Sequence, residues 1–376
     1  MLAIFCHWLI WTWIKQLPEN HWMRRNALKV KRTILGIAIV AASGLLLQVS
    51  FVWQYLPGGT IMHWYRGGAV IWAMIVVGTT IVLYPLRFLP LTEDVANPGR
   101  RQLLKAAKTL VVASPALATG FGVFVERRSI HLVTQDIHIP GLHPDLNGFK
   151  ITQISDIHLS PFLSERELAY AVDMANSTKP HLMVMTGDLI TREGDPLDTC
   201  IAHLGRLRAD YGSYGCNGNH EIYAKCEDYV EQECGRRGLR MLRQKRILIQ
   251  PGNARLNLAG VDYQRGTNPN LNDAADLLDA RSGALNILIS HNPAVFDNAA
   301  AQGWDLTLAG HTHGGQVSVE ILHQHVNLAR FYSPYTYGKY QKGKSQIFVT
   351  RGVGTVGMPA RIGAPPEVAA IRLWSA

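Results

Sequence analysis

Three long apolar runs in the first third of the 376-residue chain limit the folds that it can adopt. A helix needs roughly 20 apolar residues to cross the hydrocarbon layer of a membrane. The runs predict spanning helices over about 34–56, 69–91 and 107–125. The alternative is that they are core helices of a soluble protein, but such helices usually keep a polar face.

A shorter apolar stretch over residues 2–14 precedes these runs and contains Trp8, Trp11 and Trp13. Tryptophan favours the headgroup level of a membrane, so this stretch predicts either a short spanning helix or an interfacial one. A cleaved signal peptide is disfavoured because the basic residues follow the apolar stretch instead of preceding it.

The positive charge is concentrated in the apolar part of the chain. Residues 1–128 hold 14 Lys/Arg and 4 Asp/Glu, whereas residues 129–376 hold 23 and 24. Basic loops lie mostly on the cytoplasmic side, and the basic segments here are 15–33 and 100–108. We therefore expect a multi-pass protein of the inner (cytoplasmic) membrane whose C-terminal domain faces outside the cytoplasm. Arg127 and Arg128 favour the opposite orientation.

From residue 129 the pattern becomes that of an α/β domain, in which short β-branched runs alternate with helical stretches. This predicts two domains, a transmembrane helical region over 1–128 and a folded domain over 129–376. The expected strands are KITQIS, HLMVMTG, LNLAGV, LNILIS and DLTLAG. Each of them ends in a polar or glycine-rich turn. Ligands of α/β sheets gather at the carboxyl ends of strands.

These strand ends supply carboxylates, imidazoles and one amide, a mixture that suits a borderline divalent metal such as Mn, Fe or Zn. The candidate residues are Asp156, His158, Asp188, Asn219, His220, His291, His311 and His313. Eight groups exceed the needs of one ion and suit two, with one or two groups left for catalysis. In an extended segment residues i and i+2 face the same way, so we expect each pair, 156/158 and 311/313, to face one site.

These motifs stand in the order D-x-H, G-D, G-N-H-E, H and G-H-x-H, and the chain resembles a calcineurin-like metallophosphoesterase. SDIHLSPF, GNHEIY, SHNPAVFD and AGHTHGGQV resemble the membrane-anchored bacterial branch. That branch includes exported proteins with a twin-arginine leader, which RRQLLKAAKTLVVA resembles, and proteins similar to UDP-2,3-diacylglucosamine pyrophosphatases. The resemblance implies a four-layer α/β/β/α sandwich with both metals at one edge of the sheets.

The resemblance also implies a role for each candidate residue. One metal would be bound by Asp156, His158 and His313. The other would be bound by Asn219, His291 and His311, with Asp188 bridging the two. His220 would protonate the leaving oxygen or, with Asn219, stabilise charge on the phosphoryl group. Glu221 replaces a commoner Asp at a position that is not a ligand.

The expected function is a membrane-anchored dinuclear-metal phosphohydrolase that cleaves a phosphodiester or pyrophosphate bond by attack of a metal-bridged hydroxide. The substrate would be lipid-linked or close to the membrane. The alternative is a non-catalytic binding module on the same fold. No nucleic-acid partner is expected, since the charge of residues 129–376 is nearly balanced. Metal identity, substrate, disulfides and oligomeric state stay open.

Two further features leave alternatives open. Arg351 and Arg361 lie in the segment over 333–373, which also resembles the membrane-anchored branch, and they would either hold a second phosphate or brace loops through carbonyl groups. The basic stretch over 236–246 would either rest on anionic lipid headgroups or form a solvated helix end.

Overall fold

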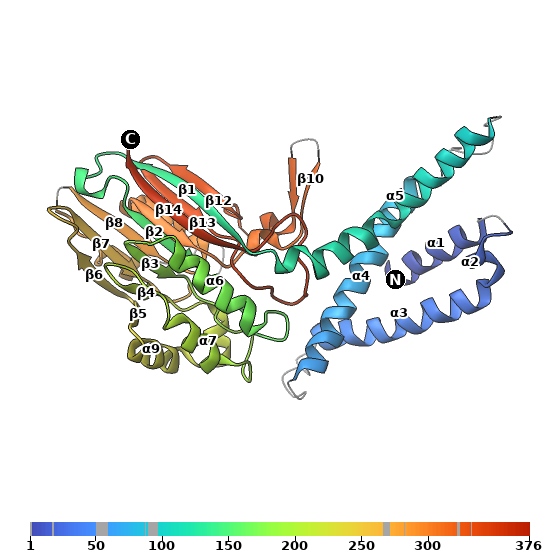
Figure 1. Cartoon of the computed structure of the whole chain (residues 1–376), viewed down its shortest axis with the longest axis horizontal. Helices are drawn as coiled ribbons and strands as arrows, with labels where there is room; N and C mark the ends of the chain where they lie inside the picture. The colour runs from blue at the N-terminus through green and yellow to red at the C-terminus, as the bar shows by residue number, and fades with distance from the viewer. Residues whose placement is uncertain are drawn as a thin grey trace. The chain divides into compact units, whose positions relative to one another are not determined.

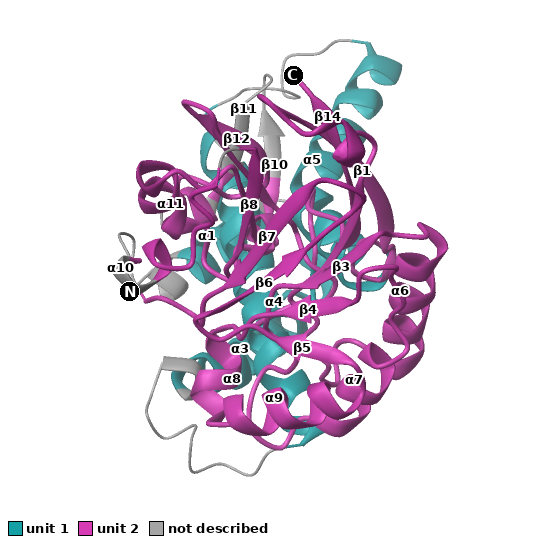
Figure 2. Cartoon of the chain, turned by 90° about the vertical axis from the view of Figure 1, so that its left-hand side faces the viewer, with its two compact units in different colours: residues 1–125, 357–360 teal, residues 126–356, 361–376 magenta. Residues whose placement is uncertain are grey.

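The computed structural model describes residues 2–16, 19–49, 59–86, 88, 97–265, 271–281, 283–321, 324–331 and 333–376. The chain divides into two compact units, which Figure 2 shows in different colours. Unit 1 comprises residues 1–125 and 357–360, and unit 2 comprises residues 126–356 and 361–376.

Unit 1 is helical. Its helices are α1 (Leu2–Gln16), α2 (Trp22–Arg25), α3 (Ala27–Val49), α4 (Thr60–Leu86) and α5 (Pro98–Phe124). Helix α4 packs against α1, α3 and α5. Small residues allow this close approach: a Cβ on Gly44 would lie 2.6 Å from that of Ala69, and one on Gly78 would lie 2.9 Å from that of Pro115. Small residues at helix contacts are typical of membrane helices.

Among the described residues, two helical segments are long and apolar enough to cross a membrane, Thr60–Leu86 and Pro98–Arg128. They overlap the second and third predicted spans, and residues 87 and 89–91 of the second lie outside the described part of the chain. The first predicted span is helical in α3 up to Val49, and its residues 50–56 lie outside the described part of the chain. The stretch over 2–14 forms α1.

Both described spans begin earlier than their apolar runs indicated. Residues 60–68, which precede the predicted span over 69–91, belong to α4. Helix α5 begins at Pro98, where the Asn97 side chain accepts hydrogen bonds from the backbone N–H groups of Gly99 and Arg100. Hydropathy marks only the apolar part of a helix, whereas a cap and a proline at the first position fix its start.

Unit 2 contains two six-stranded sheets and a two-stranded hairpin. The first sheet has the order β1 (His131–Ile139), β14 (Glu367–Ser375), β2 (Lys150–Ile154), β3 (Leu182–Met185), β4 (Ser213–Gly215) and β5 (Leu239–Met241). The second has the order β12 (Gly338–Lys342), β13 (Ser345–Val349), β9 (Leu306–Ala309), β8 (Ala284–Ile289), β7 (Arg255–Gly260) and β6 (Lys245–Ile249). The hairpin pairs β10 (Ser318–Ile321) with β11 (Gln324–Asn327).

Helices cover the outer faces of the two sheets. On the first sheet lie α6 (Glu165–Ser177), α7 (Leu197–Leu204) and α9 (Glu227–Arg236), as Figure 1 shows. On the second lie α10 (Asn272–Ala275) and α11 (Phe296–Gln302), which Figure 2 shows together. The short helix α8 (Asn219–Ala224) follows β4. The predicted α/β fold with two sheets is confirmed.

The strands of the central layers are buried on both faces. In β3, Leu182 and Val184 belong to the core between the two sheets, whereas Met183 and Met185 pack under the helices. Opposite them, Ile287 of β8 faces the core between the sheets, and Leu288 faces α11. Such strands read as continuous apolar runs, which is why KITQIS, HLMVMTG and LNILIS were recognisable.

The strand directions bring the polar turns together. Strands β2, β3, β4 and β5 are mutually parallel. In the other sheet β13, β9, β8 and β7 are mutually parallel. Parallel strands deliver all their carboxyl ends to one edge of a sheet, so the segments that follow β2, β3, β8 and β9 can share one site.

Candidate metal centre

Three groups of side chains meet at this edge, and the candidate ligand atoms within each group lie within 4.8 Å of one another. The groups are Asp156–His158–His313, His158–Asp188–His220 and Asp188–His291–His311. The structure therefore brings together seven of the eight residues that the sequence singled out. Asp188 belongs to two of the groups and lies between them.

The first group joins the turn after β2 to the turn after β9. His158 Nε2 lies 3.1 Å from His313 Nε2. Each of these two nitrogens also lies 3.4 Å from a carboxylate oxygen, that of Asp188 for His158 and that of Asp156 for His313. The Asp156 carboxylate accepts hydrogen bonds from Ser155 Oγ at 2.6 Å and from the His311 backbone N–H at 2.9 Å.

The group of Asp188, His291 and His311 is built around the Asp188 carboxylate. Asp188 Oδ2 lies 3.0 Å from His291 Nε2, and that nitrogen lies 3.1 Å from His311 Nδ1. The other ring nitrogen of His291, Nδ1, lies 2.6 Å from the Thr186 carbonyl oxygen. Because a carbonyl only accepts hydrogen bonds, Nδ1 carries a proton, and Nε2 is the ring nitrogen that faces the group.

Helix α8 places Asn219 and His220 beside Asp188. The His220 backbone N–H donates to Asp188 Oδ1 at 2.9 Å, and its Nδ1 donates to the Thr191 carbonyl. The His220 Nε2 atom lies 4.0 Å from Asp188 Oδ2. The His220 side chain is 16% exposed, while those of His158 and His291 are fully buried. His220 is therefore held by its backbone and its Nδ1, and its side chain is partly exposed.

The backbone at the centre is strained. Asp156, His158, Asp188, His311 and His313 all have positive φ, between 46° and 74°. They are five of the nine non-glycine residues with positive φ in the described part of the chain. The extended conformation predicted for the 156/158 and 311/313 pairs is therefore wrong. The side chains converge because left-handed turns aim them, and such strain concentrates at functional sites.

Two glycines allow these turns to touch. A Cβ on Gly218 would lie 2.1 Å from Asp188 Oδ1, and a Cβ on Gly310 would lie 2.2 Å from Asp156 Oδ2. Neither position has room for any side chain, because the neighbouring atom is a buried carboxylate.

Sequence reasoning missed the contribution of Glu221. This fully buried side chain accepts backbone hydrogen bonds from Asp188 and Gly218 with Oε2, at 2.9 and 2.7 Å, and from Leu189 with Oε1, at 2.7 Å. It ties the turn after β3 to the start of α8. The capping-box spacing from Gly218 to Glu221 was the available signal.

Arg361 braces the centre through carbonyl groups. Its buried guanidinium donates to the carbonyls of His313 at 2.6 Å, Arg351 at 2.8 Å and Gly354 at 3.1 Å. Arg351 Nε in turn donates to the buried carboxylate of Glu367 at 2.6 Å. Both arginines are engaged within the protein, which favours the bracing alternative over a second phosphate site.

The basic stretch over 236–246 is largely paired with acidic side chains. Arg237 contacts Glu233 at 2.7 Å, and Lys245 contacts Glu231 at 2.9 Å. Arg243 contacts Asp262 at 2.8 Å. These pairs favour a solvated, ion-paired surface over contact with lipid headgroups.

Burial sets the protonation of the histidines. It lowers the pKa of His158 and of His311 to about 3 each, so both are neutral at physiological pH. Burial also opposes protonation of His291, but the adjacent Asp188 carboxylate outweighs it and raises the pKa of His291 to about 10. That proton is the positive charge that a cation beside Asp188 would replace.

The donor set fits a divalent cation. The neutral imidazoles of His158 and His311 converge with two buried carboxylates, and the His158–His313 and His291–His311 pairs each bring two ring nitrogens to 3.1 Å from one another. Asn219 Oδ1 is also buried, and it has no hydrogen-bond partner among the described residues. A buried amide oxygen without a partner is costly, and a cation would satisfy it.

Comparison with known proteins agrees with this geometry. The calcineurin-like phosphoesterase family model matches residues 149–315. An uncharacterized metallophosphoesterase of Aquifex aeolicus is 31% identical over 237 residues, which cover 61% of this chain and 87% of that protein. The chain belongs to the calcineurin-like phosphoesterases. It is thus a metal-dependent phosphoesterase by family, and its substrate is a phosphorylated compound.

Two further relatives extend the similarity. The uncharacterized metallophosphoesterase YkuE of Bacillus subtilis is 29% identical, over 74% of this chain and 98% of its own length. A transmembrane protein with metallophosphoesterase domain from Bos taurus is also 29% identical, over 65% of this chain, which spans only 57% of that protein. Together with the two apolar helices, the bovine relative indicates membrane association.

Glu221→Gln tests the contribution of Glu221. Glutamine keeps the shape, but its amide would face backbone N–H groups that now donate to a carboxylate. We expect the full chain to bind Mn²⁺ about 10- to 100-fold more weakly, as measured by metal titration. The same substitution at exposed Glu193 is the control and should leave binding unchanged. Equal binding by both variants would contradict the role of Glu221.

Proposed function

We propose that the chain is a dinuclear-metal phosphohydrolase that cleaves a phosphodiester or pyrophosphate bond. Asp156, His158 and His313 would hold one cation. Asn219, His291 and His311 would hold the other, with Asp188 shared between them. The observation that carries the proposal is the position of Asp188, which belongs to one ligand group with His158 and to another with His291 and His311.

The protein supplies the remaining groups. Two divalent cations, when bound, would neutralise the phosphoryl oxygens and acidify a water molecule. His220 is the group that remains for proton transfer, because its Nδ1 donates to Thr191 and its side chain is partly exposed. A protonated Nε2 would donate to the leaving oxygen as the ester bond breaks. Asn219 and His220 would together stabilise charge on the phosphoryl group.

The substrate would be lipid-linked or close to the membrane, because the same chain carries two helices able to cross one. In this proposal residues 1–128 anchor the catalytic domain of residues 129–376. The anchor would lie in the inner membrane as a multi-pass region. Segments 15–33 and 100–108 would be cytoplasmic because of their basic residues, which places the catalytic domain outside.

His220→Ala tests the catalytic proposal. The full chain, stripped of metal and reloaded with Mn²⁺, should hydrolyse bis-p-nitrophenyl phosphate. The variant should keep its metal and lose about 10²- to 10⁴-fold in turnover. His138→Ala, at an exposed position on β1, is the matched control and should be fully active. A wild-type protein that binds two metals but hydrolyses neither the diester nor p-nitrophenyl phosphate would favour the binding-module alternative.

The orientation proposal predicts the activity of reporter fusions in a bacterial host. A C-terminal alkaline phosphatase, which is active only outside the cytoplasm, should be active, and a C-terminal green fluorescent protein should be dark when exported through the general secretory route. A reporter fused before residue 15 would report in the same way on which side of the membrane the N-terminal segment lies. The reverse pattern at the C-terminus would place the catalytic domain in the cytoplasm.

A further inference from the structure

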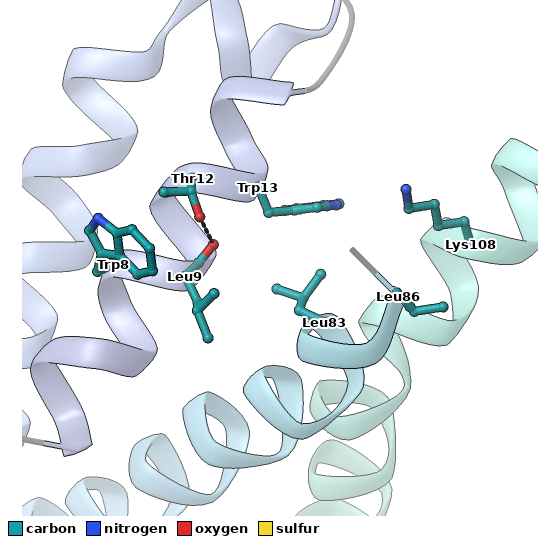
Figure 3. A pocket seen from close by; sticks show the side chains of 7 residues that line it. All are labelled: Trp8, Leu9, Thr12, Trp13, Leu83, Leu86 and Lys108. Carbon is teal, nitrogen blue, oxygen red and sulfur yellow. Dashed lines mark hydrogen bonds between the residues drawn. The ribbon is translucent and has the colours of Figure 1, made fainter. Parts of the chain in front are cut away.

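Unit 1 contains a partly open cavity of about 250 Å³ that is lined by residues of α1, α4 and α5 (Figure 3). Its lining is mostly apolar, with one cation. The lining residues are Trp8, Leu9, Thr12, Trp13, Leu83, Leu86 and Lys108. Leu9 and Leu83 are almost fully buried, at 5% and 4% exposure, so the apolar wall belongs to the packed interior of unit 1.

Lys108 stands on the inward face of α5. It lies one helical turn before Val112, which is buried, and it is itself half-buried. Lys105, three residues earlier, is exposed. An apolar helix that packs against α4 would be expected to carry an aliphatic residue at position 108, so the ammonium group there requires an explanation.

The surroundings of Lys108 supply little negative charge. In the described part of unit 1 there are eleven Lys/Arg residues and one carboxylate, Glu19. Glu19 contacts Arg24 at 3.3 Å. The counter-charge for Lys108 therefore has to come from outside this described part of the unit.

Two of the polar groups that line the cavity can only donate hydrogen bonds. Figure 3 shows the Trp13 indole nitrogen and the Lys108 ammonium extending from opposite walls toward one another. Both groups only donate hydrogen bonds. The Thr12 hydroxyl already donates to the Leu9 carbonyl at 2.8 Å. Two donors that face each other across a cavity are satisfied together by an acceptor between them, and an anion would also neutralise Lys108.

We propose that this cavity binds an anionic phospholipid. The headgroup phosphate would accept from Lys108 and Trp13, and part of an acyl chain would lie against Leu9, Leu83 and Leu86. The apolar wall selects an amphiphile over free phosphate. No carboxylate is among the described residues that line the cavity, which favours an anionic headgroup over one that carries choline. Tryptophan and lysine near the ends of spanning helices are typical partners of headgroups. This site does not depend on the proposed hydrolysis.

Native mass spectrometry of the full chain in detergent tests this site. The delipidated protein is mixed with phosphatidylglycerol or with phosphatidylcholine of the same acyl chains. We expect one phosphatidylglycerol to be retained in preference to phosphatidylcholine. Lys108→Gln should weaken phosphatidylglycerol binding about fivefold or more, and Lys108→Arg should retain it. Lys105→Gln removes the same charge at an exposed position on the same helix and should change binding less than twofold.

Leu83→Trp provides a second variant that keeps the charge. It fills the cavity and should reduce binding of phosphatidylglycerol although Lys108 is present. Each variant is first checked for a melting temperature equal to that of the wild type. Equal losses in Lys105→Gln and Lys108→Gln would reduce the effect to general surface charge and overturn the proposal. Equal retention of the two lipids by the wild type would also overturn it, as would binding of inorganic phosphate in competition with the lipid.

Discussion

Buried negative charge is the constraint on which the centre of unit 2 depends. Asp156, Asp188 and Glu221 are all buried, and an isolated carboxylate in such surroundings would be strongly destabilising. Glu221 is offset by three backbone N–H groups, whereas Asp188 faces imidazoles. Because Asp188 is not offset in the way Glu221 is, a positive charge beside the Asp188 carboxylate would stabilise it, and divalent cations would supply that charge.

The two sheets hold the strained backbone of the metal centre in place. Five residues of the centre have left-handed backbone, which costs on the order of 1 kcal/mol or more at each position. The strands before them are buried on both faces and hold the turns in place. Glycines at 218 and 310 let the turns approach each other, and Arg361 fixes the turn after β9 from behind. The fold itself therefore positions the candidate ligand atoms.

The sequence predicted the strands and the composition of the centre because both are local patterns. Continuous apolar runs such as HLMVMTG identify doubly buried strands, and the polar turn after each one is adjacent in sequence. The start of α4 and the left-handed turns at Asp156 and His311 were missed, because the spacing of apolar residues indicates neither where a helix is capped nor the sign of the backbone angle φ. Glu221 was underrated since its partners, such as Leu189, lie 32 residues away and are brought close only by the parallel pairing of β3 with β4.

The central claim is that two cations share Asp188. Anomalous diffraction from crystals of the full chain grown with Mn²⁺ measures this directly. Our account predicts two peaks, one beside Asp156, His158 and His313 and one beside Asn219, His291 and His311, with Asp188 in contact with both. A single peak, or a pair of peaks with Asp188 touching only one, would contradict it.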